Sequence, residues 1–240
     1  MQQSIEKIDL RIIDKISLHP RARRLLRSMS GPQDFPTRFG DWATACDGII
    51  MDSPELRQWR SQVGLLYTLE NHLPIAHRPD LLDNALIGLD FDSVLEVGCN
   101  LGHNLGGFVK QGKRVFGVDL LEEVLSSQPW GGAVGTAFAL PFPDNSLDLV
   151  LCAGVLCHIA LERAASAILE IERVCRKYVI VIDYSASEEL ACSFRGAQLM
   201  WRRDFQALIE GVAGSLKPIR SGITQAWDGR SSMKCVVFGK

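Results

Sequence analysis

From residue 92 onward, short apolar runs of strand character alternate with segments of helical character, and this alternation constrains the fold more than any other feature. Strands are expected at 93–98, 114–119, 132–137, 147–153 and 177–184. Helices are expected at 103–112, 121–127, 160–175 and about 198–212. Near-continuous apolar strands separated by helices are typical of a parallel sheet that is covered on both faces. The sequence therefore predicts an α/β fold.

The two ends of the chain differ from this central pattern. The segments 216–222 and 233–239 are expected to pair as antiparallel strands at the sheet edge. Residues 1–30 have a basic helical pattern that Pro20 interrupts, and Ser53-Pro54 starts a helix that runs to about His72. A shorter helix is expected at 79–88. We therefore divide the chain into an N-terminal helical extension or lid, 1–88, and a main domain, 89–240.

Composition excludes several classes of protein. The 26 basic and 28 acidic residues give a net charge of −2, which argues against a bulk nucleic-acid binder. The longest apolar runs, such as 147–157, are shorter than the roughly 18–20 residues that a membrane helix needs. The seven cysteines are scattered, with no CxxC pair, so neither a disulfide framework nor a metal site is expected. This cysteine usage predicts a protein of the reducing cytoplasm.

A glycine-containing loop follows the first strand, with Gly98 and Gly102 on either side of its turn. Glycine lets the backbone turn sharply and lets a ligand approach closely, and ligands of open α/β sheets bind beyond the carboxyl ends of the strands. A dinucleotide-binding GxGxxG motif fails here, because Asn100 and His103 stand at two of its glycine positions. The Gly-Lys-Ser/Thr ending of a phosphate-binding loop is also absent from the sequence.

Two acidic residues suggest a different ligand. Glu96 lies two residues before the first glycine, where a carboxylate disfavours a pyrophosphate but favours a ligand that carries an ammonium and a sulfonium. Asp119 ends the next strand, where an acidic side chain can accept both hydroxyls of a ribose. The pair therefore predicts a site for an adenosine-bearing cation.

These residues carry a family resemblance. EVGCNLG (96–102) and GVD (117–119) resemble motifs one and two of the class I S-adenosylmethionine (SAM)-dependent methyltransferases, and 135–150 resembles a third conserved run of that superfamily. The resemblance implies a three-layer Rossmann-like fold, with a mostly parallel seven-stranded sheet and an antiparallel edge strand. It implies SAM as cofactor, S-adenosylhomocysteine as product, adenine beside Ala137 and Phe138, and the methionine part beside Cys152. The implied cofactor-binding residues are Glu96, Gly98, Asn100, Gly102, Asp119, Leu120, Ala137, Phe138 and Cys152.

A narrower resemblance is discontinuous. The segments 39–42, 98–105, 154–159 and 201–205 are similar to the pseudaminic-acid-biosynthesis-associated methylases. This resemblance implies O- or N-methylation of a small-molecule or carbohydrate-type acceptor. The chain departs from the pattern at Trp42, near an expected tyrosine, and at Ala139, where an acid is frequent.

Methyl transfer from a sulfonium mainly requires that the acceptor be held in line and that water be excluded. His158 is our candidate for a general base, because it follows the fourth strand and imidazole titrates near neutral pH; the alternative is a helix-start histidine bonded to the backbone. Trp42 belongs either to a lid or to a surface loop. Arg202 and Arg203 either clamp an anionic acceptor or lie on a solvated helix face.

Two other functions stay open. The first is a nucleic-acid or protein methyltransferase that docks through its basic N-terminal helix. Against it stand the near-neutral charge and the absence of an Asn/Asp-Pro-Pro-Tyr/Phe motif after the fourth strand. The second is a non-catalytic subunit that binds a partner through 1–88. The retention of both Glu96 and Asp119 argues against it.

Overall fold

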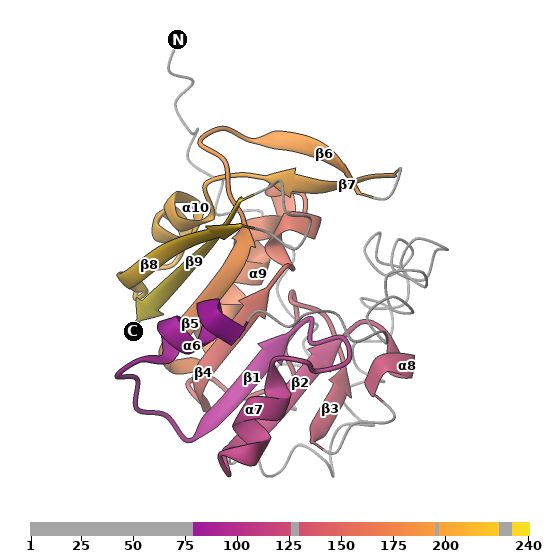
Figure 1. Cartoon of the computed structure of the whole chain (residues 1–240). Coiled ribbons are helices and arrows are strands. Elements are labelled where there is room, and N and C mark those ends of the chain that lie inside the picture. Colours follow the sequence, from indigo (N-terminus) through magenta and orange to yellow (C-terminus); the bar gives the residue numbers. More distant parts are fainter. Residues whose placement is uncertain (1–78, 126–129, 195–196, 226–231) are drawn as a thin grey trace.

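The fold is a seven-stranded sheet in the strand order β3-β2-β1-β4-β5-β9-β8, shown in Figure 1. The computed structural model describes residues 79–125, 130–194, 197–225 and 232–240. The strands are β1 (Ser93–Val97), β2 (Arg114–Asp119), β3 (Gly131–Val134), β4 (Leu147–Ala153), β5 (Cys175–Tyr184), β8 (Lys217–Gln225) and β9 (Ser232–Gly239). Strands β1 to β5 pair in parallel, whereas β9 is antiparallel to both of its neighbours. The mostly parallel sheet and the antiparallel pair at its edge are thereby confirmed.

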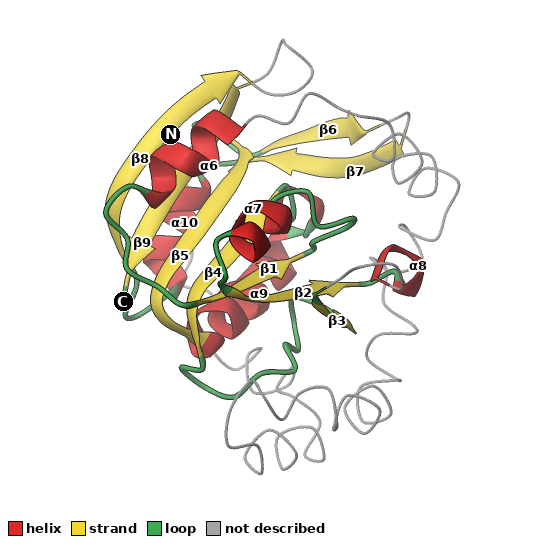
Figure 2. Cartoon of the chain, turned by 60° about the horizontal axis from the view of Figure 1, so that its bottom comes forward, coloured by secondary structure: helices red, strands yellow, loops and turns green. Residues whose placement is uncertain are grey.

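Helices cover both faces of the sheet (Figure 2). They are α6 (Pro79–Leu86), α7 (Leu105–Lys110), α8 (Glu122–Leu125), the 3-10 helix η2 (Leu156–His158), α9 (Leu161–Val174) and α10 (Phe205–Val212). Two buried apolar clusters mark the layers. One joins the sheet to α9 and α10, and the other joins it to α6 and α7. The expected three-layer architecture is therefore present.

The register of the central strands places the site. Val97, the last residue of β1, pairs with Val118 of β2 and with Cys152 of β4. Strand order runs outward in both directions from the β1–β4 pair, which makes this pair the switch point of the sheet. The loops after β1, β2 and β4 consequently leave the sheet side by side.

Most expected elements agree with the structure to within a few residues, but two loops at the carboxyl ends of the strands are longer than expected. The third strand ends at Val134 rather than at 137, and Thr136 instead forms an isolated bridge with Ala139. The helix expected at 103–112 occupies only 105–110, because the turn from the glycine loop extends to Asn104. Both changes lengthen the loops at the carboxyl ends of the strands.

The helix expected at about 198–212 is wrong in its first part. Residues Ala197–Arg202 form β7, which pairs antiparallel with β6 (Leu190–Phe194) in a separate two-stranded sheet. The helix α10 begins only after Asp204, whose carboxylate caps it by accepting from the Ala207 backbone N–H at 3.1 Å. Arg202 and Arg203 therefore do not lie on a helix, and the interpretation of a solvated helix face is also wrong.

Several expectations fall on residues outside the described part of the chain. They are the helices at 1–30 and 53–72 and the lid containing Trp42. The first described element, α6, packs against the sheet, and Arg220 of β8 donates to the carbonyls of Asn84, Ala85 and Ile87. None of the helices in the described ranges has the length and apolar character needed to cross a membrane. The six cysteines of these ranges are free, and no His/Cys/Asp/Glu group within them suits a metal ion.

Candidate functional site

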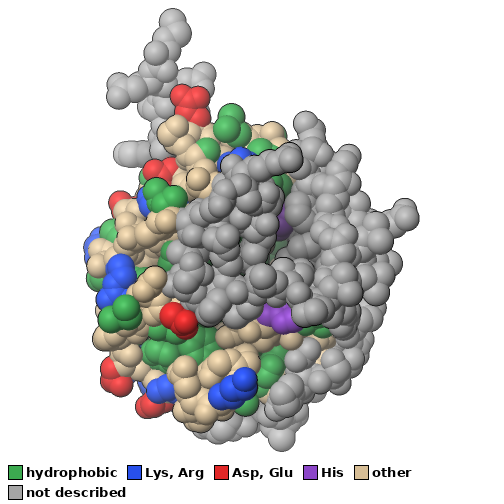
Figure 3. All heavy atoms as spheres, viewed as in Figure 1, with side chains coloured by type: hydrophobic (Ala, Val, Ile, Leu, Met, Phe, Trp, Pro, Cys, Tyr) green, Lys and Arg blue, Asp and Glu red, His purple; other side chains and the backbone are tan. Residues whose placement is uncertain are grey.

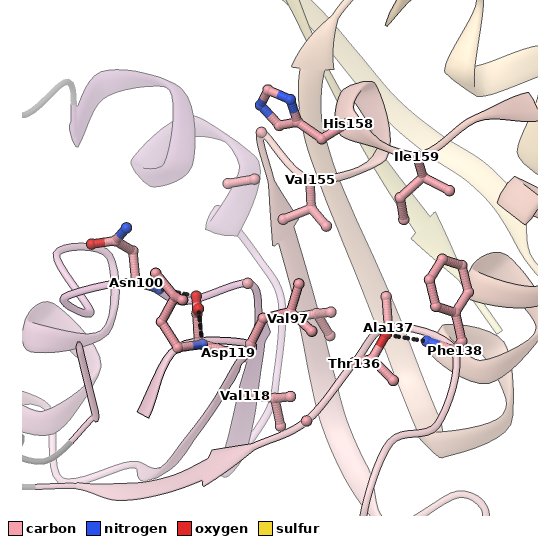
Figure 4. A pocket seen from close by; sticks show the side chains of 16 residues that line it. Val97, Asn100, Val118, Asp119, Thr136, Ala137, Phe138, Val155, His158 and Ile159 are labelled. Atoms are coloured by element: carbon pink, nitrogen blue, oxygen red, sulfur yellow. Dashed lines mark hydrogen bonds between the residues drawn. The ribbon is translucent and has the colours of Figure 1, made fainter. Parts of the chain in front are cut away.

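A pocket opens at the carboxyl ends of β1, β2 and β4, and Figure 4 shows it from close by. Its walls come from four chain segments. They are Val97, Gly98 and Asn100; Val118–Leu121; Gly135–Phe138; and Ala153–Val155 with His158 and Ile159. The pocket therefore lies at the switch point, where the three loops leave the sheet.

The glycine loop has little conformational freedom. Gly98 has φ +70°, and a Cβ atom there would lie 2.4 Å from Cγ2 of Val155. Gly102 has φ +71°, and a Cβ atom there would lie 2.1 Å from the ring of Trp130. Both positions require glycine, for the conformation and for the space. The loop is thus held between the β4 loop on one side and Trp130 on the other.

Asp119 connects β2 to this loop. Its Oδ2 accepts from the backbone N–H of Asn100 at 2.8 Å, and its Oδ1 accepts from that of Leu121 at 3.0 Å. Burial raises the pKa of Asp119 in spite of these hydrogen bonds. The side chain also lines the pocket, so the carboxylate is placed to accept from hydroxyl groups of a ligand.

Glu96 lies beneath the same loop rather than in the pocket wall. Its side chain is buried, with 2% exposure, and Oε1 accepts from Nδ2 of Asn104 at 2.5 Å. The other oxygen, Oε2, has no hydrogen-bond partner among the described residues. Burial, with a smaller contribution from Asp119, raises the pKa of Glu96 to about 8. A buried carboxylate with one open oxygen is costly unless a cationic group pairs with it.

Residues 136–138, from the loop after β3, form another wall of the pocket. The Phe138 backbone N–H donates to Oγ1 of Thr136 at 3.4 Å. The guanidinium of Arg163, from α9, lies over the Phe138 ring at 3.9 Å from its centroid. Arg163 was not singled out from the sequence, since its spacing on α9 gives no sign that it faces an aromatic ring.

His158 ends η2 and lies at the pocket rim (Figure 4). Its backbone N–H donates to the Val155 carbonyl at 2.9 Å, as expected for the first turn of a helix. The position of η2 is held by Asp183 at the end of β5, whose Oδ2 accepts from the Cys157 backbone N–H at 3.1 Å. Burial raises the pKa of Asp183 to about 6.

The pocket thus brings together seven residues singled out from the sequence: Gly98, Asn100, Asp119, Leu120, Ala137, Phe138 and His158. Cys152 lies in the core, fully buried, and the next residue, Ala153, lines the pocket instead. Gly102, Arg202 and Arg203 also lie outside the lining, and Trp42 is outside the described residues. Val155 and Ile159 were missed as wall residues, because apolar side chains carry no distinctive sequence signal.

With this geometry in view, residues 95–182 match the family described as "Methyltransferase domain". A curated relative, "Uncharacterized methyltransferase YcgJ" of Bacillus subtilis (strain 168), is 32% identical over 108 residues. That match covers 40% of this chain and 42% of the relative, so the chain spans less than half the length of this relative.

Solved structures agree on the fold. A 1,6-didemethyltoxoflavin-N1-methyltransferase from Burkholderia thailandensis, crystallised with 1,6-didemethyltoxoflavin and S-adenosylhomocysteine, matches with a TM-score of 0.54 at 16% identity, over 87% of this chain and 86% of that chain. The [4+2]-cyclase SpnF matches with a TM-score of 0.52 at 16% identity, over 67% of this chain and 79% of that one. The fold is that of the class I SAM-dependent methyltransferases.

The methyltransferase fold explains the arrangement of the pocket. Its glycine loop and its two acidic residues lie at the switch point, where a ligand of such a sheet binds. The domain match and the name of the relative support an enzyme of the SAM-dependent methyltransferase class. The match to a cyclase shows that the fold alone does not decide the reaction.

Proposed function

We propose that this chain transfers a methyl group from SAM to oxygen or nitrogen of a small-molecule or carbohydrate-type acceptor. One observation carries the proposal. A buried carboxylate with an open oxygen, that of Glu96, lies under the same loop that Asp119 fixes at the pocket wall. Such a pair complements a ligand that has a cationic amino acid at one end and a ribose in the middle.

The residues present fit SAM. The open Oε2 of Glu96 would accept from the ammonium of the methionine part, and Asp119 would accept from the ribose hydroxyls. Ala137 and Phe138 would flank the adenine, and Gly98 and Asn100 of the glycine loop would lie against the ligand. When bound, SAM supplies a methyl group already activated by a sulfonium.

Residues on the pocket rim would exclude water and accept the proton of the acceptor. Val155 and Ile159 provide an apolar wall that excludes water from the reacting atoms. His158 lies on the same rim and would accept the proton of an acceptor hydroxyl or amine. Replacing His158 with alanine should lower the transfer rate by about 10²-fold or more while leaving the dissociation constant of SAM unchanged.

On the face seen in Figure 3, basic side chains of the described residues are interspersed with acidic ones. The net charge of −2 supports a small acceptor over a nucleic acid, whose phosphates favour a basic surface. We further infer that residues 89–240 constitute the SAM-binding domain of a cytoplasmic enzyme and that 1–88, with Trp42, form its helical extension.

The first test is calorimetric titration with SAM. The wild type should bind, and Asp119→Ala should weaken binding by about 100-fold, because two charge-assisted hydrogen bonds are lost. Asp119→Asn, which keeps an acceptor for one backbone N–H, controls for disruption of the loop. Failure of the folded wild type to bind SAM would contradict the proposal and favour a partner-binding subunit.

The second test follows the methyl group. Tritiated-methyl SAM is incubated with protein and a cell extract, which is then separated into sugars and other small molecules, lipids, protein and RNA. The proposal expects label in the small-molecule or glycan fraction. Label only in RNA or protein would overturn the acceptor assignment, and binding without any label would point to a reaction other than methyl transfer.

A further inference from the structure

Arg203, the residue after β7, has a buried guanidinium with open hydrogen-bonding positions. The residue is 3% exposed, and none of its three side-chain nitrogens has a hydrogen-bond partner among the described residues. Its Nε lies 3.1 Å from Oε2 of Glu189, a charge contact without hydrogen-bond geometry, and the Glu189 side chain is 36% exposed. The two terminal nitrogens, which make the bidentate contacts of arginine, are left open.

This arrangement is unusual within the same molecule. Arg173, which is also largely buried, donates to both oxygens of Glu170, to Asp144 and to the carbonyls of Leu140 and Phe142. The fold therefore supplies hydrogen-bond acceptors to a buried guanidinium where that group connects chain segments. Around Arg203 it supplies aromatic rings instead, since the rings of Trp201 and Phe205 lie 5.8 and 5.6 Å from the guanidinium carbon. A buried cation without hydrogen-bond acceptors lowers the stability of the fold unless a ligand supplies those acceptors.

Strand β7 connects Arg203 to the part of the pocket rim that carries His158. Figure 1 shows the β6–β7 hairpin above the carboxyl end of β5, and the pocket lies at the carboxyl ends of β1, β2 and β4. Strand β7 packs against η2, the short helix that carries His158 to the pocket rim. Burial lowers the pKa of Arg203, and the charges of Glu189 and Asp183 oppose that shift. Asp183 itself is engaged by the backbone N–H groups of Cys157 and Tyr184, so the terminal nitrogens stay available.

We propose that the terminal nitrogens of Arg203 bind a carboxylate or phosphate of the methyl acceptor, and hence that the acceptor is an anion. A planar fork of two N–H groups matches either oxyanion, which a compact ammonium does not. The inference rests on the proposed function and narrows it. It assigns the β6–β7 hairpin, which lies outside the seven-stranded sheet, to acceptor recognition.

The first experiment separates an anion site from a structural ion pair. Arg203→Met replaces the cation with an apolar side chain of similar length, Arg203→Lys keeps the charge without the fork, and Arg114→Met removes an exposed arginine at the start of β2 as a matched control. Thermal midpoints are measured with S-adenosylhomocysteine and increasing inorganic phosphate at constant ionic strength. Phosphate should raise the midpoint of the wild type and of Arg114→Met, raise that of Arg203→Lys less, and not affect Arg203→Met.

The midpoints without phosphate are equally informative. Arg203→Met should be at least as stable as the wild type, because no internal hydrogen bond is lost. A lower midpoint, a failure to fold, or a phosphate shift equal to that of the wild type would show that Arg203 has a structural partner, and would overturn the proposal.

The second experiment addresses the acceptor. Extract labelled with tritiated-methyl SAM is separated by anion exchange, and a parallel sample is treated with phosphatase before labelling. Label should appear in the anionic fraction and fall at least tenfold with Arg203→Met, while calorimetry shows SAM affinity within twofold of the wild type. Loss of label after phosphatase identifies a phosphate, and its persistence identifies a carboxylate. Absence of label from the anionic fraction overturns this inference, whereas absence of SAM binding by the wild type overturns the proposed function.

Discussion

Within the described residues, a buried charged group is fully hydrogen-bonded at the amino end of the sheet, whereas two at its carboxyl end keep unpartnered atoms. At the amino end, Asp148 of β4 is fully buried and accepts from the backbone of Asp92, from the backbone and hydroxyl of Ser93, and from Arg176. At the carboxyl end, Glu96 and Arg203 are just as deeply buried but keep atoms with no partner among the described residues.

The pKa values follow the same division. Burial opposes ionisation of Asp148, but its hydrogen bonds and Arg176 outweigh that effect and lower its pKa. Burial dominates at Glu96 and raises its pKa to about 8. The comparison indicates that charge at the amino end contributes to stability, whereas charge at the carboxyl end lowers stability, as expected of the proposed ligand sites.

The largest expected effect tests the amino end. Asp148→Ala leaves Arg176 and three donors of Asp92 and Ser93 without their acceptor, and should lower the free energy of unfolding by about 3–5 kcal/mol. Urea denaturation measures this change. Arg176→Met, at a side chain that is 49% exposed, should cost about 1 kcal/mol. If Asp148→Ala were as stable as the wild type, the contrast between the two ends would fail.

The next prediction tests the carboxyl end, where removing a buried charge should raise stability instead of lowering it. Glu96→Gln keeps an acceptor for Asn104 but removes the charge, so SAM affinity should fall by about 10- to 100-fold. Because folding raises the pKa of Glu96 from 4.5 to about 8, ionisation of this group costs stability increasingly as pH rises between those values. The variant should therefore melt higher than the wild type at pH 8.5 and at the same temperature near pH 4.5. Lower stability of the variant at pH 8.5 would contradict the prediction.

A third effect concerns the pH dependence of binding. A cationic ligand binds the ionised form of Glu96, so the affinity of the wild type for SAM should rise with pH from 6 to 8, by up to about tenfold per pH unit. Calorimetry in buffers of different ionisation enthalpy should detect proton release on binding. Glu96→Gln should lose both responses; if it kept them, another group would be responsible.

The smallest effect concerns the adenine wall. Arg163→Met removes the guanidinium over Phe138, an interaction that contributes about 0.5–1 kcal/mol at exposed sites, and should weaken SAM binding by about threefold. Arg163→Lys should lie between this variant and the wild type. An unchanged dissociation constant in Arg163→Met would show that the ring needs no such support.

The sequence was most informative where local pattern and chemistry coincide. The strand 147–153 has the expected bounds, since a continuous apolar run fits a strand buried on both faces. Gly98 and Asp119 were found because a turn of positive φ and a charge at a strand end each require a particular residue type.

The misses have a common origin in long-range packing. Residues 197–202 form a strand because they pair with β6, and local periodicity does not contain that partner. Arg203 is buried because β7 packs on η2, so its sequence neighbours gave no sign of its burial. Within β4 both faces are apolar, and alternation therefore did not show that Ala153, rather than Cys152, lines the pocket.

The close approach of Gly98 and Val155 limits how this enzyme class can be re-engineered on the present scaffold. Because a single added carbon at Gly98 would reach Cγ2 of Val155, a bulkier residue at 155 has nowhere to expand toward β1. If the proposed function is right, substitutions at Val155 made to change acceptor binding will also disturb the loop that would hold SAM. On the proposed acceptor role of the β6–β7 hairpin, directed evolution toward new acceptors should start from that hairpin and leave the Gly98–Val155 contact unchanged.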